Sequence, residues 1–154
     1  MSDVVHKHHG TVDRCIGDGL MAIFGAPQKL EHPERHALEA AQEMIERLAE
    51  VNAHLATMGE APIRIGIGLH SGEIVVGHIG SRERHNYTAI GDVVNVASRL
   101  EGLSKTSGHV IIVSKTVAEA LGYPKMLSSL GESPVSGHSA QEIYGWNPAV
   151  LATA

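Results

Sequence analysis

The chain has 154 residues, of which 43% are hydrophobic and 19% charged, and these proportions are typical of one globular domain with a real core. Its net charge of −5 offers no basic surface for nucleic acid or an anionic membrane. No stretch approaches ~18 consecutive apolar residues, and the N-terminus lacks the apolar core of a secretory signal. We therefore expect a cytoplasmic protein with no nucleic-acid partner and no membrane segment.

Residues 1–9 are predicted to form the last turns of a helix, with Gly10 as the left-handed residue that ends it. His6, His8 and His9 are close enough in the sequence to suggest a metal cluster. We favour a solvated helix end, because no cysteine or carboxylate supplies a further ligand at a recognised spacing.

A hairpin is predicted next, because apolar runs at 11–16 and 20–24 flank a turn with the Asp-Gly signature. Asp18 then presents an exposed carboxylate at this turn. Cys15 in the first run is the only cysteine, so no intrachain disulfide can form and a reducing compartment is compatible. A nucleophilic thiol is one interpretation of Cys15, but we expect a packed or half-buried side chain.

A loop broken by Pro27 and Pro33 precedes a long amphipathic helix, predicted over 34–58. At the start of this helix, His32 and His36 are four residues apart and could bind a metal, but we favour a solvated first turn. The expected buried stripe consists of Ala37, Ala41, Met44, Leu48, Val51 and Leu55, flanked by Leu38 and Ile45.

The middle and end of the chain alternate between short strands and helices. Apolar, glycine-rich runs at 63–69 and 73–79 predict a second hairpin, followed by a charged tip at 81–86. Strand–strand–helix units in this order predict an α+β fold. The remaining expected elements are a strand at 110–113, a helix at 114–121, paired strands at 126–130 and 142–146, and a frayed tail at 147–154.

Residues 87–101 organise the rest of the chain, because they predict a strand end, a turn at Gly91 and a helix start. We expect Asp92 to cap this helix with its carboxylate. Asn95 and Arg99 are four residues apart and share a polar face that suits a polyanion such as a triphosphate. The alternative is a surface helix with a solvated Asn and Arg. The opposite, apolar stripe comprises Val93, Val96, Ala97, Leu100 and Leu103.

Three blocks of the sequence together resemble the class III nucleotide cyclases, the adenylate and guanylate cyclase catalytic domain. They are GTVDRCIGDGLMAIFG at 10–25, RIGIGLHSGEIVVGHIG at 64–80 and IGDVVNVASRLE at 90–101. They occur in the family's order, and the resemblance covers roughly residues 1–146. It implies a ferredoxin-like α+β domain over 1–146, with 147–154 as a C-terminal tail.

The family's first strand carries one of its two metal carboxylates in a short Asp-containing motif, and no such motif occurs in this sequence. We therefore expect a domain that lacks this central first strand and is truncated at its N-terminus. A chain of this kind could be inactive in isolation. The alternative to an enzyme is a non-catalytic nucleotide-binding pseudo-cyclase with a regulatory role.

The resemblance assigns roles to the polar residues. Asp18 would hold Mg²⁺ or Mn²⁺, of which the family uses two ions. Asn95 would position the ribose, and Arg99 would stabilise charge on the α-phosphate. Family sites form between two chains, with metal residues from one and the Asn/Arg pair from the other, so a homodimer with two equivalent sites is implied.

Arg14 and Thr88 occupy the two positions that contact the purine base in the family. Arg14 can only donate hydrogen bonds and the Thr88 hydroxyl can accept one, which suits adenine, so the expected substrate is ATP. Arg14 departs from the Lys usual in adenylate cyclases, and guanylate cyclase is the alternative. His138, or Ser136, stands where the family has a Lys that contacts the triphosphate.

Overall fold

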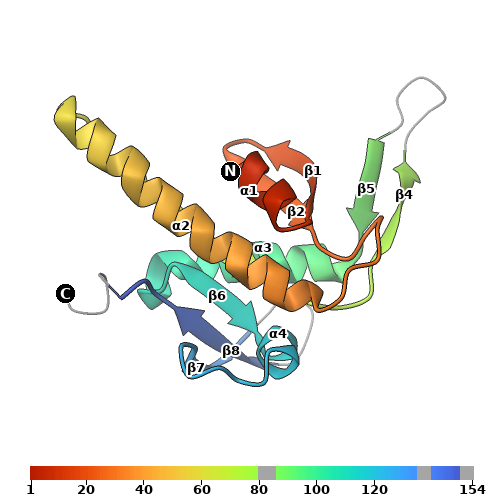
Figure 1. Cartoon of the computed structure of the whole chain (residues 1–154). Helices are drawn as coiled ribbons and strands as arrows, with labels where there is room; N and C mark the ends of the chain where they lie inside the picture. Colours follow the sequence, from red (N-terminus) through yellow and green to blue (C-terminus); the bar gives the residue numbers. More distant parts are fainter. Residues whose placement is uncertain (80–85, 135–139, 150–154) are drawn as a thin grey trace.

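The computed structural model describes residues 1–79, 86–134 and 140–149 (Figure 1), and for 16, 78, 79 and 86–90 it describes the backbone and not the side chain. The helices are α1 (Ser2–Lys7), α2 (Pro33–Thr57), α3 (Asp92–Ser107) and α4 (Lys115–Ala120). The strands are β1 (Thr11–Ile16), β2 (Gly19–Ile23), β3 (Ile67–Leu69), β4 (Val75–Ile79), β5 (Asn86–Ile90), β6 (Ile111–Ser114), β7 (Ser128–Ser133) and β8 (Gln141–Trp146).

The described strands form three separate sheets. One is the β1–β2 hairpin, one is the antiparallel pair β4–β5, and the third has the order β3-β6-β8-β7. In the third sheet β3 lies parallel to β6, while β8 runs antiparallel to both β6 and β7. Mixed sheets with helices packed on them confirm the α+β class.

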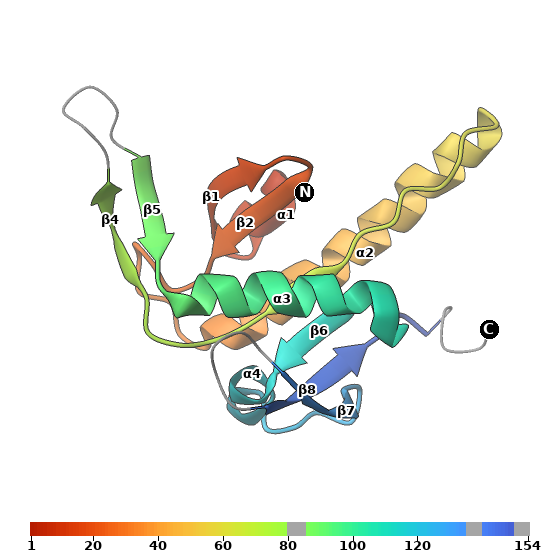
Figure 2. The same cartoon turned by 180° about the vertical axis from the view of Figure 1, so that it is seen from behind.

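Strand β6 carries the core on both of its faces. Ile111 and Val113 pack in a cluster with α2 and α4, whereas Ile112 packs in a second cluster with α3 and β8. All three side chains are completely buried. Because successive residues of a strand point to opposite faces, this short apolar run joins two helical layers. The two views agree, with α2 in front in Figure 1 and α3 in front in Figure 2.

The long helix α2 is buried over only part of its length. Its buried residues are Leu38, Ala40, Ala41 and Ile45, all in its first half. Val51 is 46% exposed, because the C-terminal half of α2 extends beyond the four-stranded sheet (Figure 1). The predicted stripe was therefore right at Ala41 and wrong in its extent: Leu38 and Ile45, expected at its edge, are buried, whereas Val51 is exposed.

The second predicted hairpin, between 63–69 and 73–79, was also wrong. These runs belong to different sheets, since β3 pairs with β6 and β4 pairs with β5. The parallel partner of β3 lies more than forty residues further along the chain, and local periodicity contains no information about such a partner. The strand β6, the helix α4 and the pairing of β7 with β8 confirm three further expected elements. Residues 81–85 of the expected charged tip and residues 150–154 of the expected tail lie outside the described part of the chain.

Two predicted helix ends are shifted by one residue. Helix α1 ends with His9 in the left-handed conformation (φ 62°), and the N–H of Gly10 donates to the carbonyl oxygen of Val5 at 2.8 Å. Gly10 is needed for space, because a Cβ there would lie 2.7 Å from the Phe24 ring. At α3 the cap is Gly91, with φ 154°, and Asp92 is the first helical residue rather than the cap.

Cys15 is exposed, contrary to the expected packed thiol. The register of β1 shifts between Val12 and Arg14, which makes Asp13 an extra residue opposite β2. A bulge of this kind changes which side chains point inward. The side chain of Asp13 is only 1% exposed, and Cys15 faces outward.

Gly68 allows α3 to lie directly against β3. A Cβ at this position would collide with the backbone of α3 at Ala97, Leu100 and Glu101. Backbone atoms cannot move aside as a flexible side chain can, so a larger residue would displace the whole helix.

We predict that Gly68→Ala lowers the free energy of unfolding by about 1–3 kcal/mol, the usual cost of overpacking. Gly102→Ala is the matched control on α3, because a Cβ there meets no atom within 4 Å. It should stabilise the protein by about 0.5–1 kcal/mol, since Gly is a poor helix former. Urea denaturation measures both variants, and an unchanged midpoint for Gly68→Ala would contradict the packing argument.

Candidate active site

Asp18 lies at the turn of the β1–β2 hairpin. Ile16 pairs with Gly19, which leaves Gly17 and Asp18 as the two turn residues, and Gly17 adopts φ 61°. The carboxylate is exposed, as expected. Among the described residues Asp18 belongs to no group of three potential metal ligands. Its oxygens suit a hard dication, so it fits as one ligand beside phosphate oxygens and water.

Asn95 and Arg99 lie on the exposed side of α3. The opposite side of the helix buries Val96 and Leu100 against Ile112 of β6. Neither Asn95 nor Arg99 makes a hydrogen bond or ion pair to another side chain in the part of the chain that the structure describes. The amide and the guanidinium thus remain accessible to an anionic ligand, one turn apart.

The hairpin turn and the α3 face are separate within one chain. No hydrogen bond or ion pair among the described residues joins Asp18 to Asn95 or Arg99. The single chain therefore presents two exposed sets of polar groups, one carboxylate on a hairpin and one amide–guanidinium pair on a helix.

Asp13 orients Arg14 through a side-chain contact that was not predicted from the sequence. Its Oδ2 accepts a hydrogen bond from Arg14 Nε at 2.9 Å. The carboxylate is almost completely buried, while the Arg14 side chain is 44% exposed. The adjacent acidic and basic residues in the sequence could have indicated this ion pair. The β-bulge, however, turns the Asp13 side chain inward, and only in this position can it hold the guanidinium at the surface.

The strand that carries Arg14 contacts the strand that carries Thr88. Arg14 is on β1 and pairs with Met21, and Thr88 is on β5 and pairs with Gly77. The two strands contact each other, and Figure 1 shows the hairpins as neighbours. The Thr88 side chain, and His138 and Ser136 entirely, lie outside what the structure describes.

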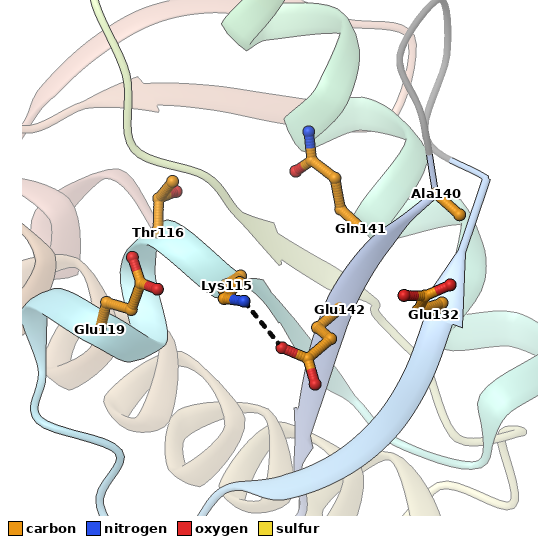
Figure 3. Close-up of a pocket in the computed structure, with 7 residues that line it drawn as sticks. All are labelled: Lys115, Thr116, Glu119, Glu132, Ala140, Gln141 and Glu142. Carbon is orange, nitrogen blue, oxygen red and sulfur yellow. Dashed lines mark ion pairs between the residues drawn. The ribbon is translucent and has the colours of Figure 1, made fainter.

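A shallow surface hollow lies between α4 and the β7–β8 pair (Figure 3). Lys115 Nζ donates to Glu142 Oε2 at 3.0 Å across it, and this hydrogen bond raises the pKa of Lys115. Glu119 and Glu132 add two further carboxylates. Three carboxylates and one engaged lysine make a poor site for a triphosphate. None of the described residues that line the hollow is one of the site residues predicted from the sequence.

The comparisons with known proteins agree with this fold. The family model described as Adenylate and Guanylate cyclase catalytic domain matches residues 1–147, and the chain belongs to this family. Adenylate cyclase 1 of Rhizobium meliloti is 38% identical over 144 residues, which are 93% of this chain and 22% of that protein. This chain spans less than a quarter of the length of the curated relatives that it matches first.

Two solved structures extend the comparison to three dimensions. The guanylyl cyclase Cya2 superposes with a TM-score of 0.80 at 35% identity, over 94% of this chain and 73% of that chain. The adenylyl cyclase CyaB from P. aeruginosa gives a TM-score of 0.87 at 28% identity, over 96% and 76%. The fold is therefore that of the cyclase catalytic domain. None of the helices in the described ranges is both long enough and apolar enough to cross a membrane.

Proposed function

We propose that this protein is an adenylate cyclase catalytic domain that converts ATP to 3′,5′-cyclic AMP and pyrophosphate for cyclic-nucleotide signalling. The observation that carries the proposal is the pair of Arg14 and Thr88 at the base positions, with Arg14 oriented by Asp13. The similarity to a relative named Adenylate cyclase 1 supports the same substrate.

The hydrogen-bonding capacity of these two residues favours adenine. Adenine offers an acceptor at N1 and an amino donor at N6, which match a guanidinium donor and a hydroxyl acceptor. Guanine presents an N1–H, which a carboxylate would bind. Neither base position carries an acidic residue, and the neighbouring Asp13 carboxylate is buried and engaged by Arg14.

The reaction is an intramolecular displacement at the α-phosphorus of ATP. The ribose O3′ forms a bond to the α-phosphorus, the bond to the bridging oxygen breaks, and pyrophosphate leaves while the O3′ proton passes to solvent. Asn95 would hold the ribose so that O3′ lies in line with the breaking bond. Arg99 would donate to the α-phosphate oxygens, where negative charge develops in the transition state.

Asp18 would hold a divalent ion, Mg²⁺ or Mn²⁺, because its exposed carboxylate offers hard oxygen ligands. When bound, such an ion supplies positive charge that offsets the charge of the phosphates. One carboxylate needs further ligands, and the nucleotide's own phosphate oxygens are suitable ones.

We further propose that the active protein is a homodimer. Asp18 and the Asn95/Arg99 pair are both exposed, yet no contact joins them within the described chain. A twofold axis that places the hairpin of one chain over α3 of its partner would create two equivalent sites. Each site would then take its metal ligand from one chain and its phosphate ligand from the other.

Guanylate cyclase is the second candidate. Arg14 replaces the Lys usual in adenylate cyclases, and a guanylyl cyclase, Cya2, is 35% identical to this chain. A pseudo-cyclase that binds nucleotide without turnover is the third, and it is motivated by Asp18 being the single family metal carboxylate in the sequence. Product analysis separates all three.

The first functional prediction concerns the base. With equal ATP and GTP and excess Mn²⁺, the purified protein should form cyclic AMP in preference to cyclic GMP, because no carboxylate meets the guanine N1–H. Chromatography of the products measures the ratio. A preference for cyclic GMP would favour the guanylate candidate, and tight nucleotide binding without either product would favour the pseudo-cyclase.

The second concerns Arg99. Arg99→Ala should lower kcat by about 10²–10³-fold with a smaller change in KM, because the guanidinium acts mainly on transition-state charge. Lys105→Ala on the same helix is the control, since Lys105 pairs with Glu101 at 3.8 Å and has no proposed role. Equal kcat values for Arg99→Ala and the wild type would refute the assigned role.

The third concerns the shared site. Asp18→Ala and Arg99→Ala should each retain about 1% of wild-type activity or less, whereas an equimolar mixture should regain about a quarter of it. Half of the random dimers are mixed, and each mixed dimer has one intact site of two. Cyclic AMP formation before and after mixing measures the gain. If mixed dimers form, as mass spectrometry can establish, and yet activity stays absent, the two-chain site is wrong.

A further inference from the structure

The end of α1 and the first turns of α2 bring together metal-ligating side chains from separate parts of the sequence. His8 comes from the C-terminal cap of α1, and His36 and Glu39 come from α2. One ligand atom from each lies within 4.8 Å of the other two. In the sequence His8 and His36 belong to two separate groups, each expected to be solvated, because 28 positions separate them.

The local backbone explains this arrangement. His36, Glu39 and Glu43 occupy one face of α2, at spacings of three and four residues. The left-handed turn at His9 ends α1 beside this face. The His9 ring contacts the His36 ring edge-on, with centroids 5.4 Å apart, and so restricts the orientation of His36.

Glu43 holds His8 in a tautomer that can bind a metal. His8 Nε2 lies 2.8 Å from Glu43 Oε2, and Lys7 Nζ lies 2.7 Å from the same oxygen. A carboxylate oxygen accepts hydrogen bonds, so Glu43 Oε2 accepts the Nε2–H of His8. The lone pair of His8 then lies on Nδ1, which faces Glu39 Oε2 at 3.9 Å.

We propose that His8, His36 and Glu39 bind a borderline transition-metal dication of the Zn²⁺ class, separate from the Mg²⁺ or Mn²⁺ of the nucleotide site. Two imidazoles and one carboxylate are the ligands that Zn²⁺, Co²⁺ and Ni²⁺ prefer. Histidine ligands of such ions commonly donate the hydrogen of their other ring nitrogen to a carboxylate. Water would complete the coordination.

The geometry requires only a small adjustment. Tetrahedral ligands on Zn²⁺ lie about 3.3–3.5 Å apart, given bonds of about 2.0–2.1 Å. The Glu39 side chain is 50% exposed and can rotate inward, whereas His8 is 17% exposed and held by Glu43. The open side at Glu39 also gives an ion access from solvent. The bound ion would link α1 to α2.

A different interpretation needs no metal, since Lys7 forms an ion pair with Glu43 and His8 donates a hydrogen bond to it, and these contacts already link α1 to α2. In that case His36 and Glu39 bind no metal. The two interpretations therefore differ in what substitution of His36 or Glu39 does to metal binding.

The test is titration of the metal-free protein, purified without a histidine tag and without nucleotide, with CoCl₂ and then ZnCl₂. We expect one Co²⁺ to bind per chain and to show the intense visible absorption of low-coordinate Co²⁺. Zn²⁺ should displace the bound Co²⁺, whereas Mg²⁺ should not. Zn²⁺ should also raise the melting temperature of the protein. Asp18→Asn should leave the Co²⁺ spectrum unchanged, because its carboxylate belongs to the other site.

His36→Ala and Glu39→Gln should each weaken Co²⁺ binding by about 10-fold or more, and Glu43→Gln should weaken it by a similar factor through the loss of the oriented His8. His6→Ala on α1 and His54→Ala on α2 are the matched controls, since both histidines are exposed and neither belongs to the group. Because the Glu39 side chain is exposed, Glu39→Gln should not disturb folding. This variant therefore tests the proposed metal ligand even if His36→Ala folds poorly. Absence of the visible absorption, or equal weakening by the control substitutions, would overturn the proposal.

Discussion

Burial of β6 on both faces is the constraint on which the rest of the structure depends. Three consecutive side chains of this strand are completely buried, and they alternate between the layer that contains α2 and the layer that contains α3. Because apolar burial is the main favourable term in folding, a strand of this kind determines where both helices must pack. The positions of the polar residues on those helices follow from it.

The position of α3 is the clearest consequence. Its apolar side packs on Ile112, and its close approach to β3 depends on the missing side chain of Gly68. Asn95 and Arg99 are then necessarily on the outer side of the helix, where a nucleotide or a second chain can contact them. Asp18 is held elsewhere, at a hairpin turn in a different sheet, so the two halves of the proposed site are exposed for the same reason: neither is covered by this chain's own core.

Carboxylates position other side chains at two places in the structure. Asp13 is buried by a β-bulge and holds the Arg14 guanidinium at the surface, and Glu43 holds His8 at the junction of α1 and α2. In both cases a carboxylate oxygen accepts a hydrogen bond from the residue that would contact a ligand. Such oriented donors and ligands lose less conformational freedom when a ligand binds.

Local patterns in the sequence predicted most of the helices and strands, and its motifs predicted the family. Asp-Gly turn chemistry and helical periodicity are local properties, so the β1–β2 hairpin with Asp18 at its turn, the helix that carries Asn95 and Arg99, and the pairing of β7 with β8 could all be predicted. Only the tertiary structure decided the parallel pairing of β3 with β6, the outward face of Cys15 and the meeting of His8 with His36. These features depend on contacts between distant segments and on one bulge at Asp13, and the periodicity of a sequence contains information only about neighbours along the chain.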